Sequence, residues 1–537
     1  MINEGVCEGC GDCSVKSNCL SVVPISTELG RKRAIDQSSC NKDYSCVNGF
    51  CPSFVTVQGG QLKKPVTNMG SGENESFSSE ALPSPSLPEL NEPFGIIVTG
   101  IGGTGVVTIG ALLGMAAHIE GKGVSVLDMA GLAQKGGAVV SHIRIGKTPE
   151  DLHAVRIAAG CAKTIIGCDL MVAASPDVLA KMQPGITQAV INNQETITGD
   201  FTRNPDMNLM GAEMAKIIDV AVGDDASSYY QGSRLATALL GDSIATNLFM
   251  LGIAWQKGLI PLSAEALEMA IELNAVAVDF NKNAFLWGRR TVINQVKVET
   301  IAKPVTPLRL KEPKIAITLE NIIDKRSNML INYQNEDYSN RYIELVQKVI
   351  KIEKSKTKGL TGLSEAVAKY YYKLLAYKDE YEVARLYTNG NFANSLKDQF
   401  EGKYKLKFHL APPLFGKRDA ITGHLIKREF GPWMMSVFTI IAKLKFLRGT
   451  KFDIFGYSSE RKLERQLIDA YEKNIELVLS KLNNENYELA VAIASIPEHI
   501  RGFGHVKENH IEKAKLEEQS LLSVFVNPQA STAEAAE

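Results

Sequence analysis

The pattern of hydrophobic and polar positions changes along the 537-residue chain, and its most regular part begins at residue 94. From there to about residue 290, short β-branched runs alternate with helical or glycine-rich stretches. This alternation predicts a mainly parallel sheet that is covered by helices. The runs expected to form strands are Gly95–Thr99, Val124–Asp128, Val139–Ile145, Leu170–Ala174 and Ala189–Asn192. Two longer helical patterns follow, at 233–257 and 263–283.

A second pattern begins after a bridge near 303–314 that contains proline and lysine. Apolar residues here recur with the spacing of helices. We expect helices at Leu363–Thr388, Pro432–Leu447 and Ser458–Leu482, the last of them capped by Ser458, and one strand at Tyr404–Leu410. The sequence therefore predicts an α/β core domain followed by a mostly α-helical C-terminal domain.

The remaining segments carry little periodicity. Residues 1–56 are rich in cysteine, and residues 57–93 are rich in Gly, Ser, Pro, Asn and Glu. The second segment cannot bury a core, so we expect a flexible linker. The predicted division is a cysteine-rich segment, a linker, an α/β domain, a helical domain and a disordered tail, at 1–56, 57–93, 94–300, 301–525 and 526–537.

Composition and charge exclude several classes of protein. Hydrophobic residues make up 45% and charged residues 22%, which excludes a wholly disordered chain, a collagen-like fibre and a disulfide mini-protein. The net charge of -1 gives no reason to expect nucleic acid or a membrane surface as a partner. No apolar run approaches the roughly 20 residues that span a bilayer. The N-terminus does not resemble a signal peptide, so we expect a cytoplasmic protein.

Seven of the nine cysteines lie within the first 51 residues, which favours metal binding over disulfides. The run Cys7-x2-Cys10-x2-Cys13 is typical of the loop that holds three irons of one iron–sulfur cubane. The fourth thiolate of such a cluster is usually followed by proline, as Cys51 is. We therefore predict a four-iron, four-sulfur (4Fe-4S) cluster on Cys7, Cys10, Cys13 and Cys51.

A second cluster needs a different ligand set, because two cubanes take eight ligands and only seven cysteines are present. In the second run, Asp43 stands midway between Cys40 and Cys46. A carboxylate can bind iron but is a harder ligand than a thiolate. We propose Cys40, Asp43, Cys46 and Cys19 as the second set. If Asp43 does not bind, this site could hold three irons or stay empty.

Other readings of the N-terminal segment stay open. Structural zinc is an alternative, although a closed zinc site takes only four ligands. The basic run Arg31-Lys32-Arg33 predicts a solvated turn, with docking of an acidic partner as the second interpretation. The downstream Cys161 and Cys168 are expected to be small buried hydrophobic residues.

A glycine-rich loop, Gly100-Ile-Gly102-Gly103-Thr104-Gly105, follows the first predicted strand and opens a helix. Glycines let the backbone approach a phosphate, and a helix N-terminus offers free N–H groups. Asp128 lies 23 residues after the last glycine, where a nicotinamide-binding domain holds the ribose. This supports an alternative function, an iron–sulfur oxidoreductase that uses NAD(P). For Asp128 the simpler interpretation is a strand-end cap.

A second loop with Lys135, Gly136 and Gly137 follows Asp128 directly. It places a cation and mobile backbone beside the first loop, which suits a second phosphate or a subunit surface. Tight-turn geometry is the simpler explanation for Gly136 and Gly137.

The chain resembles the 2-oxoacid:ferredoxin oxidoreductases, and most closely the long, fused indolepyruvate ferredoxin oxidoreductases. The resemblance rests on the cysteine segment, the GIGGTG unit and the runs MAGLAQKGGAVVSHIRI, GDSIATNLFMLGIAWQKGLIPLS, YKDEYEVARLY, KFHLAPPL and RGFGHVKE. It implies a ferredoxin-like iron–sulfur segment, a gamma-type α/β domain and the C-terminal domain of the fused enzymes. Members of the family usually carry Gln at the position of Thr104, so no side-chain role is transferred to this residue.

The resemblance also implies a reaction and its partners. The family decarboxylates a 2-oxo acid on thiamine diphosphate, transfers the acyl group to coenzyme A and passes single electrons through iron–sulfur clusters to ferredoxin. The glycine loop would then bind phosphate near coenzyme A or contact a subunit. No thiamine diphosphate motif, a GDG followed by paired Asn, occurs in this sequence. We therefore expect a subunit or C-terminal part that works in an oligomer with a thiamine diphosphate-binding partner.

The segment 402–451 carries eleven Lys or Arg residues against two acidic ones. A solvated helical face explains this simply, and docking of acidic ferredoxin or coenzyme A phosphates is the alternative. A third possible function of the whole chain is that of a zinc-stabilised assembly protein.

Overall fold

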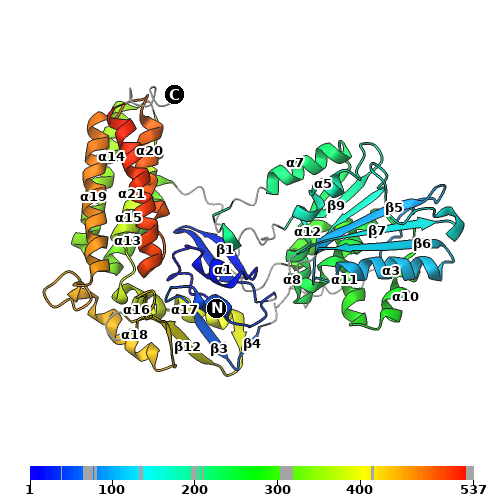
Figure 1. Ribbon diagram of the computed structural model, residues 1–537, viewed down its shortest axis with the longest axis horizontal. Coiled ribbons are helices and arrows are strands. Elements are labelled where there is room, and N and C mark those ends of the chain that lie inside the picture. The colour runs from blue at the N-terminus through cyan, green and yellow to red at the C-terminus, as the bar shows by residue number, and fades with distance from the viewer. Residues whose placement is uncertain are drawn as a thin grey trace. The chain divides into compact units, whose positions relative to one another are not determined.

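A computed structural model of the chain describes residues 1–37, 39–63, 77, 81–131, 137–194, 202–204, 206–207, 211–302, 318–357, 359–412 and 416–527. The chain forms two compact units, labelled by element in Figure 1. One, here called the cysteine–helix unit, comprises Met1–Asp36, Cys40–Lys63 and Leu310–Glu537. The other, the α/β unit, comprises Gln37–Ser39 and Lys64–Arg309. The two units are described separately.

The α/β unit is built on a six-stranded sheet with the strand order β10-β9-β8-β5-β7-β6. Strands β5, β8, β9 and β10 pair in parallel, whereas β7 runs antiparallel between β5 and β6. All strands except β7 therefore point the same way, which confirms the prediction of a mainly parallel sheet. The strands are β5 (Phe94–Ile101), β6 (Gly123–Ala130), β7 (Ala138–Gly146), β8 (Thr164–Gly167), β9 (Gln188–Asn192) and β10 (Ser227–Tyr230).

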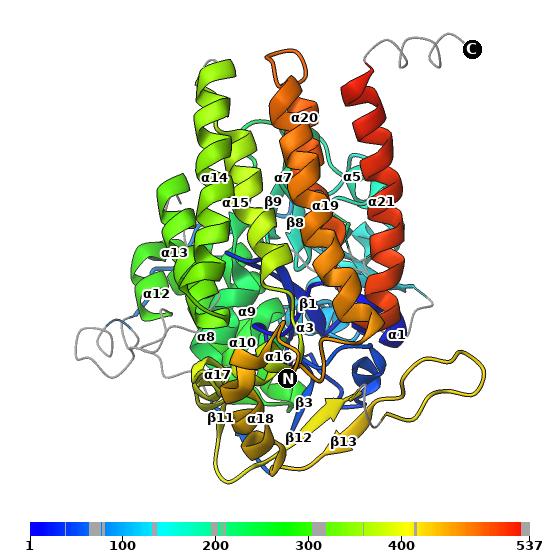
Figure 2. The ribbon, with the colours of Figure 1, turned by 90° about the vertical axis from the view of Figure 1, so that its left-hand side faces the viewer.

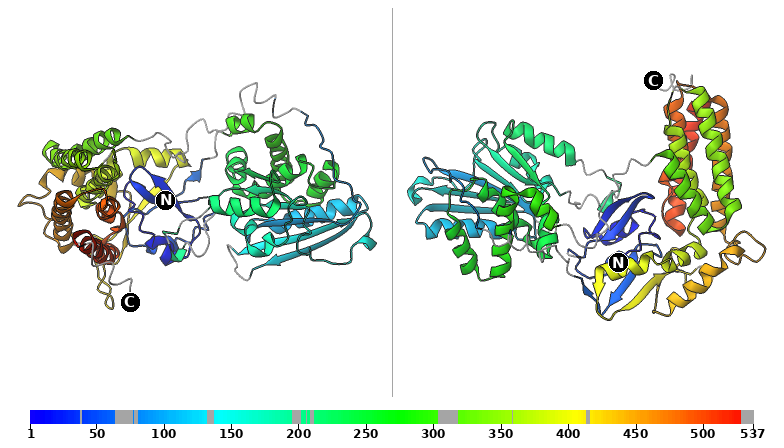
Figure 3. Two further views of the ribbon diagram at one scale, coloured as in Figure 1. Left: turned by 90° about the horizontal axis from the view of Figure 1, so that it is seen from above. Right: turned by 180° about the vertical axis from the view of Figure 1, so that it is seen from behind.

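Helices cover both faces of this sheet, as Figure 3 shows from two further sides. Along β5, the side chains of Ile96 and Val98 enter one hydrophobic core and that of Ile97 enters another, because alternate residues of a strand face opposite ways. The helical elements are α3 (Val106–Ile119), η3 (Pro149–Asp151), α4 (Leu170–Ala173), α5 (Pro176–Leu179), α7 (Gly211–Val222), α8 (Gly232–Leu240), η4 (Ser243–Ala245), α9 (Thr246–Gln256), α10 (Ala264–Asn274), α11 (Val278–Ile293) and α12 (Gln295–Ile301).

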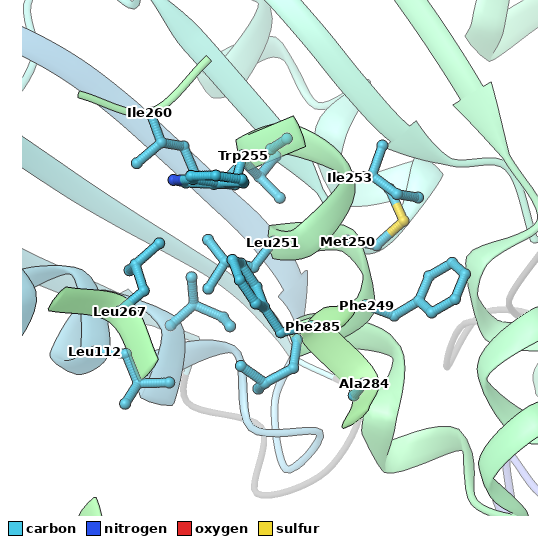
Figure 4. Close-up of a cluster of buried hydrophobic side chains, with 14 of the residues drawn as sticks. Leu112, Phe249, Met250, Leu251, Ile253, Trp255, Ile260, Leu267, Ala284 and Phe285 are labelled. Atoms are coloured by element: carbon cyan, nitrogen blue, oxygen red, sulfur yellow. The ribbon is translucent and has the colours of Figure 1, made fainter. Parts of the chain in front are cut away.

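Helix α9 lies at the centre of the larger core, and every one of its residues is buried. Figure 4 shows its side chains among those of neighbouring elements, with Trp255 and Phe285 close together. The ring centroids of these two residues are 6.0 Å apart. Helices α9 and α11 cross where both carry glycine: a Cβ at Gly252 would lie 2.1 Å from the Phe285 carbonyl oxygen, and one at Gly288 would lie 2.0 Å from that of Phe249. The two glycines therefore permit this close helix contact.

Three predictions for this unit need correction. The run Leu170–Ala174 was expected to be a strand, but it forms helix α4, and the strand is β8 just before it. Asp169 starts that helix by accepting a hydrogen bond from the Val172 N–H at 3.0 Å, and a short apolar run cannot distinguish helix from strand. The helical pattern 233–257 breaks at Gly241, which has φ 83°. The pattern 263–283 breaks between Asn274 and Val278.

In the cysteine–helix unit, long helices form a bundle that Figure 2 shows side by side. Its centre contains stacked tyrosines: the Tyr371 ring lies 6.1 Å from that of Tyr342 and 5.8 Å from that of Tyr471, between centroids. The predicted helix Ser458–Leu482 is confirmed, with Ser458 as its cap. The bundle elements are α13 (Leu319–Tyr333), α14 (Glu336–Lys356), α15 (Gly362–Leu375), α19 (Ser459–Lys481), α20 (Tyr487–Ser495), η6 (Ile496–His499) and α21 (Gly504–Val526).

Shorter elements occupy the rest of the C-terminal region. The strand expected at Tyr404–Leu410 is confirmed as β12. The single helix expected at Leu363–Thr388 is two helices, because Asp379 begins a new one by accepting a hydrogen bond from the Glu382 N–H at 2.8 Å. The basic segment 402–451 is not one helical face, since it contains strands and a buried Arg448. These elements are α16 (Glu380–Thr388), α17 (Asn391–Gln399), β11 (Phe400–Glu401), β12 (Lys405–Leu410), β13 (Arg428–Phe430), α18 (Met434–Lys443) and η5 (Leu444–Leu447).

The cysteine-rich segment is joined to this C-terminal region by backbone hydrogen bonds. Strand β3 pairs antiparallel with β12, and β4 pairs antiparallel with β11. The Tyr387 hydroxyl also donates a hydrogen bond to the Pro52 carbonyl oxygen at 2.7 Å. The two ends of the chain therefore build one structure. The elements of the N-terminal segment are α1 (Asp12–Ser17), β1 (Val22–Thr27), β2 (Gly30–Ile35), η1 (Ser45–Asn48), β3 (Val55–Gln58) and β4 (Gln61–Leu62).

Within the described ranges, the helices are all too short or too polar to cross a membrane.

Candidate metal centre and glycine-rich loop

The first group of predicted ligands surrounds one small cavity. Cys7, Cys10, Cys13 and Cys51 all line it, together with Phe50, Phe54 and backbone of the loop between them. Cys7 and Cys13 are buried, and the other two are half-buried. The structure therefore brings together the four thiols that the spacing assigned to one cluster, although Cys51 lies far along the chain from the other three.

Glycine shapes the loop that carries the first three thiols. Gly9 has φ 71°, and a Cβ there would lie 2.0 Å from the Arg31 carbonyl oxygen. The Gly9 N–H also donates a hydrogen bond to Cys7 Sγ at 3.3 Å. Backbone N–H groups aimed at cysteine sulfur stabilise thiolates and tune iron–sulfur clusters. A side chain at position 9 would displace this loop.

Three further contacts fix Cys51 and the residues beside it. Asp12 Oδ2 accepts a hydrogen bond from the Phe50 N–H at 2.7 Å, which ties the residue before Cys51 to the first run. The Cys51 thiol and the Ser53 hydroxyl are 2.9 Å apart and share a hydrogen bond. Gly49 packs so closely that a Cβ there would lie 2.7 Å from the Cys13 Cα. The ligand-bearing segments are thus fixed relative to one another.

The charges of the four thiols act on each other. Burial, and after it the charge of Cys51, raises the pKa of Cys10 and Cys13 well above the ordinary value. Burial also raises the pKa of Cys51, and the Lys427 ammonium opposes that rise. Four soft donors in one buried space become favourable as thiolates only when a positive centre compensates them. This donor set fits an iron–sulfur cluster.

The second group lies nearer the surface. Burial, followed by the charge of Cys19, raises the pKa of Cys46 to about 11, and Cys40 and Asp43 add to this effect. The charges of all three other proposed ligands therefore act on Cys46. The Cys40 sulfur accepts a hydrogen bond from the Lys42 N–H at 3.4 Å. Asp43 is exposed, and its Oδ1 accepts hydrogen bonds from the Ser45 N–H at 3.1 Å and hydroxyl at 3.0 Å.

Among the residues that the structure describes, no group of three or more His, Cys, Asp or Glu side chains is arranged to hold a single metal ion. The two cysteine groups are defined instead by the shared cavity and by their mutual charges. Whether Asp43 binds iron stays a prediction.

The structure overturns one expectation for this segment. Arg31-Lys32-Arg33 was expected to be a solvated turn, but these residues lie on β2, with Lys32 7% and Arg33 0% exposed. The Arg33 charge counteracts the rise in the pKa of Cys13. Cys161 is exposed rather than buried, whereas Cys168 is buried as expected. Thus the basic run belongs to the surroundings of the thiols.

In the α/β unit, the glycine-rich loop connects β5 to α3. Gly103 and Gly105 have φ 86° and 91°, and a Cβ at Gly100 would lie 2.4 Å from Val106 Cγ2. The Thr104 side chain closes the turn by donating a hydrogen bond to the Ile101 carbonyl oxygen at 2.7 Å. Among the described residues, none caps α3 at Gly105 through its side chain. The loop therefore offers exposed backbone at a helix N-terminus.

Two contacts extend this loop. The Gly102 N–H donates a hydrogen bond to the Gly137 carbonyl oxygen at 2.7 Å, so the second glycine-rich loop meets the first. Lys135 and Gly136 lie outside the described residues. Asn247 of α9 donates its side-chain N–H to the Thr104 carbonyl oxygen at 2.7 Å. Nothing in the sequence pointed to Asn247 except its place in the run GDSIATNLFMLGIAWQKGLIPLS, which resembles the family.

The sheet order argues against the NAD(P) alternative. In a dinucleotide-binding domain, the strand that ends in the acidic residue lies directly beside the first strand and parallel to it. Here β7 separates β6 from β5. Asp128 accepts a hydrogen bond from the Ser141 hydroxyl of β7. The Asp128 carboxylate is therefore engaged by the neighbouring strand β7 at the edge of the sheet. It does not stand beside the glycine loop, as a ribose-binding residue would.

Comparisons with known proteins agree with this geometry. Residues 95–291 match the family model described as pyruvate ferredoxin/flavodoxin oxidoreductase, and residues 319–520 match one described as a family of unknown function. The indolepyruvate oxidoreductase subunit IorB of Archaeoglobus fulgidus is 27% identical over 37% of this chain and 95% of that protein. The subunit of the same name from Pyrococcus horikoshii is 28% identical over 36% of this chain and 94% of that protein.

Solved structures were also found. A pyruvate oxidoreductase subunit, PORC, from Thermotoga maritima is 20% identical over 37% of this chain and 96% of that chain, with a TM-score of 0.28. A 2-oxoglutarate:ferredoxin oxidoreductase from Magnetococcus marinus is 16% identical over 38% of this chain and 31% of that chain, with a TM-score of 0.29.

The α/β unit is thus of the type found in oxidoreductases that act on 2-oxo acids. Residues 95–291 are therefore similar to 2-oxoacid:ferredoxin oxidoreductases, and the similarity to the IorB subunits covers 36–37% of the chain.

Proposed function

We propose that the chain is a component of an indolepyruvate or arylpyruvate:ferredoxin oxidoreductase. The observation that carries this proposal is the cavity lined by Cys7, Cys10, Cys13 and Cys51 in a chain whose other unit is of the 2-oxoacid oxidoreductase type. The relatives named indolepyruvate oxidoreductase subunits support the substrate class. Neither cysteine spacing nor the sheet would by itself identify that substrate.

The cysteine groups would serve electron transfer. Cys7, Cys10, Cys13 and Cys51 would hold one 4Fe-4S cluster, and Cys19, Cys40, Cys46 and Asp43 a second one. Bound clusters supply one-electron carriers. The protein's own contribution is to hold the thiols in place through Asp12 and Ser53, to exclude water from the buried first group and to leave the second group near the surface, where an electron acceptor can approach.

The glycine-rich loop would serve the other half of the reaction. Its exposed backbone at the N-terminus of α3 suits a phosphate of coenzyme A or a contact with another subunit. Gly100, Gly102, Gly103, Thr104, Gly105, Lys135, Gly136 and Gly137 are the residues proposed for this role.

The overall reaction requires a thiamine diphosphate-binding partner. One 2-oxo acid and one coenzyme A give one acyl-coenzyme A, one carbon dioxide and one proton, and two electrons reduce two ferredoxins. A reducing cytoplasm would suit the free cysteines. We infer that this chain relays the electrons and shapes the site, while decarboxylation takes place on the partner.

The proposal is tested by reconstitution with the thiamine diphosphate-binding subunit of an indolepyruvate oxidoreductase. We expect ferredoxin reduction that requires indolepyruvate, coenzyme A and both subunits. Isothermal titration should also detect coenzyme A binding to the complex. Reduction of the clusters by NADH or NADPH without the partner would contradict the proposal and favour the NAD(P) alternative. A colourless chain that holds zinc and no sulfide would favour the assembly protein.

A further inference from the structure

Lys427 reaches from the C-terminal region into the cysteine segment. Its Nζ donates hydrogen bonds to the carbonyl oxygens of Val47, at 2.8 Å, and Gly49, at 2.7 Å. It also lies 4.8 Å from the centroid of the Phe54 ring, which lines the first cavity. The contacted residues lie both before and after Cys51 in the chain. A half-buried ammonium is thus held between the segment with Cys46 and the segment with Cys51.

Lys378 makes similar contacts with the segment that carries Cys7. It lies in the break between α15 and α16, and its Nζ donates hydrogen bonds to the carbonyl oxygens of Val6, at 3.2 Å, and Cys7, at 3.1 Å. It also forms an ion pair with Glu8, and the two side chains are only 13% and 12% exposed. The helix break that places this lysine is fixed by Asp379, which caps α16 and binds Arg448.

Both lysines belong to residues 319–520, the part that matches a family of unknown function. Withdrawing an ammonium from water costs free energy, and backbone carbonyls offset only part of that cost. For Lys378 the Glu8 carboxylate already supplies part of the compensation, and a further nearby anion would offset the rest for both lysines. A cubane held by four thiolates is such an anion, and it gains one further negative charge when it accepts an electron.

We propose that residues 319–520 supply positive charge beside the first cluster site. Through this charge, Lys378 and Lys427 raise the reduction potential of the cluster held by Cys7, Cys10, Cys13 and Cys51. This inference rests on the proposed function, because it needs a cluster at that site. Net charge around a cluster and hydrogen bonds near its sulfurs are established controls of its potential. The lysines act as positioning residues: they touch the ligand loops and not the cluster.

The test is a redox titration of the anaerobically purified full chain, followed by electron paramagnetic resonance. Lys427→Met and Lys378→Met should each weaken the stabilisation of the reduced cluster by about tenfold, which for a one-electron couple lowers the midpoint potential by about 59 mV. Lys427→Arg keeps the charge and should restore the potential. Lys348→Met is the matched control, because Lys348 of α14 pairs with Glu476 of α19 within the bundle, at 2.5 Å.

Iron and sulfide are measured on every variant, so that the outcomes stay distinct. Wild-type protein without a cluster would refute the proposed function, whatever the variants do. Intact clusters with the wild-type potential in both Met variants would overturn this inference alone. Loss of iron from both Met variants, but not from Lys348→Met, would also overturn it, because the lysines would then be structural.

Discussion

Cys51→Ala is expected to lower the iron of the purified chain from roughly eight to roughly seven where the three remaining thiolates keep a three-iron cluster, and to roughly four where the first cluster is lost. Cys51 is the ligand that closes the first group, and the other three thiols of that group lie on one short segment that ends in the first turn of α1. Three thiolates leave one iron corner without its protein ligand. The second group keeps its own donors, so its iron should stay.

The matched control is Cys161→Ala, which removes an exposed thiol from the α/β unit. This variant should keep the full iron content. Far-ultraviolet circular dichroism shows whether both variants keep their helices, so that loss of iron is not confused with loss of fold. Cys51→Ala with undiminished iron and sulfide would contradict the assignment of Cys51.

Arg448→Met is expected to lower the free energy of unfolding of the cysteine–helix unit by about 3–5 kcal/mol. Arg448 and Asp379 form a bidentate pair, at 2.6 and 2.8 Å, in which each side chain is 3% exposed. Arg448 also donates to the Tyr333 carbonyl oxygen at 2.7 Å, with its guanidinium 3.7 Å from the centroid of that ring. Its removal would leave the Asp379 carboxylate buried without its cationic partner, with the Glu382 N–H still donating to it.

Urea unfolding followed by circular dichroism measures this loss, and hydrogen exchange at the first amides of α16 locates it. Arg341→Met serves as the control, because Arg341 pairs with Glu472 at 2.7 Å but is 41% exposed. Exposed pairs contribute about 1 kcal/mol or less. Equal losses in the free energy of unfolding in the two variants would contradict this prediction, because the buried Arg448 pair would then contribute no more than the exposed Arg341 pair.

Local features of the fold were predictable from the sequence. The strands at 95–99, 124–128, 139–145 and 189–192 were found because β-branched runs have a local signature. The joining of the two chain ends was not predictable, since β3 pairs with β12 across more than three hundred residues. Asp379 begins α16 and binds the distant Arg448, and this contact leaves no mark in the local pattern. The local pattern therefore predicted one continuous helix over α15 and α16.

In the candidate site, too, local features were predictable from the sequence, whereas contacts between distant segments were not. The spacing of Cys7, Cys10 and Cys13, with the proline after Cys51, grouped the four thiols, and the structure places all four around one cavity. The basic run on β2 was misread, because charged runs are usually solvated and only tertiary packing buries this one. Lys378 lies in the run YKDEYEVARLY and Lys427 in the basic segment 402–451, but neither stretch pointed to contacts with the cysteine segment. Their role arises from contacts between segments that are distant in the chain.

The central claim is that the N-terminal cysteines hold iron–sulfur clusters. Iron and acid-labile sulfide per chain, after strictly anaerobic purification, test it most directly. We expect about eight of each, with Asp43 as a ligand of the second cluster. About seven iron would assign three irons to the second site and leave Asp43 unbound, and about four would leave that site empty. Zinc without sulfide would contradict the claim, and with it the electron-transfer function.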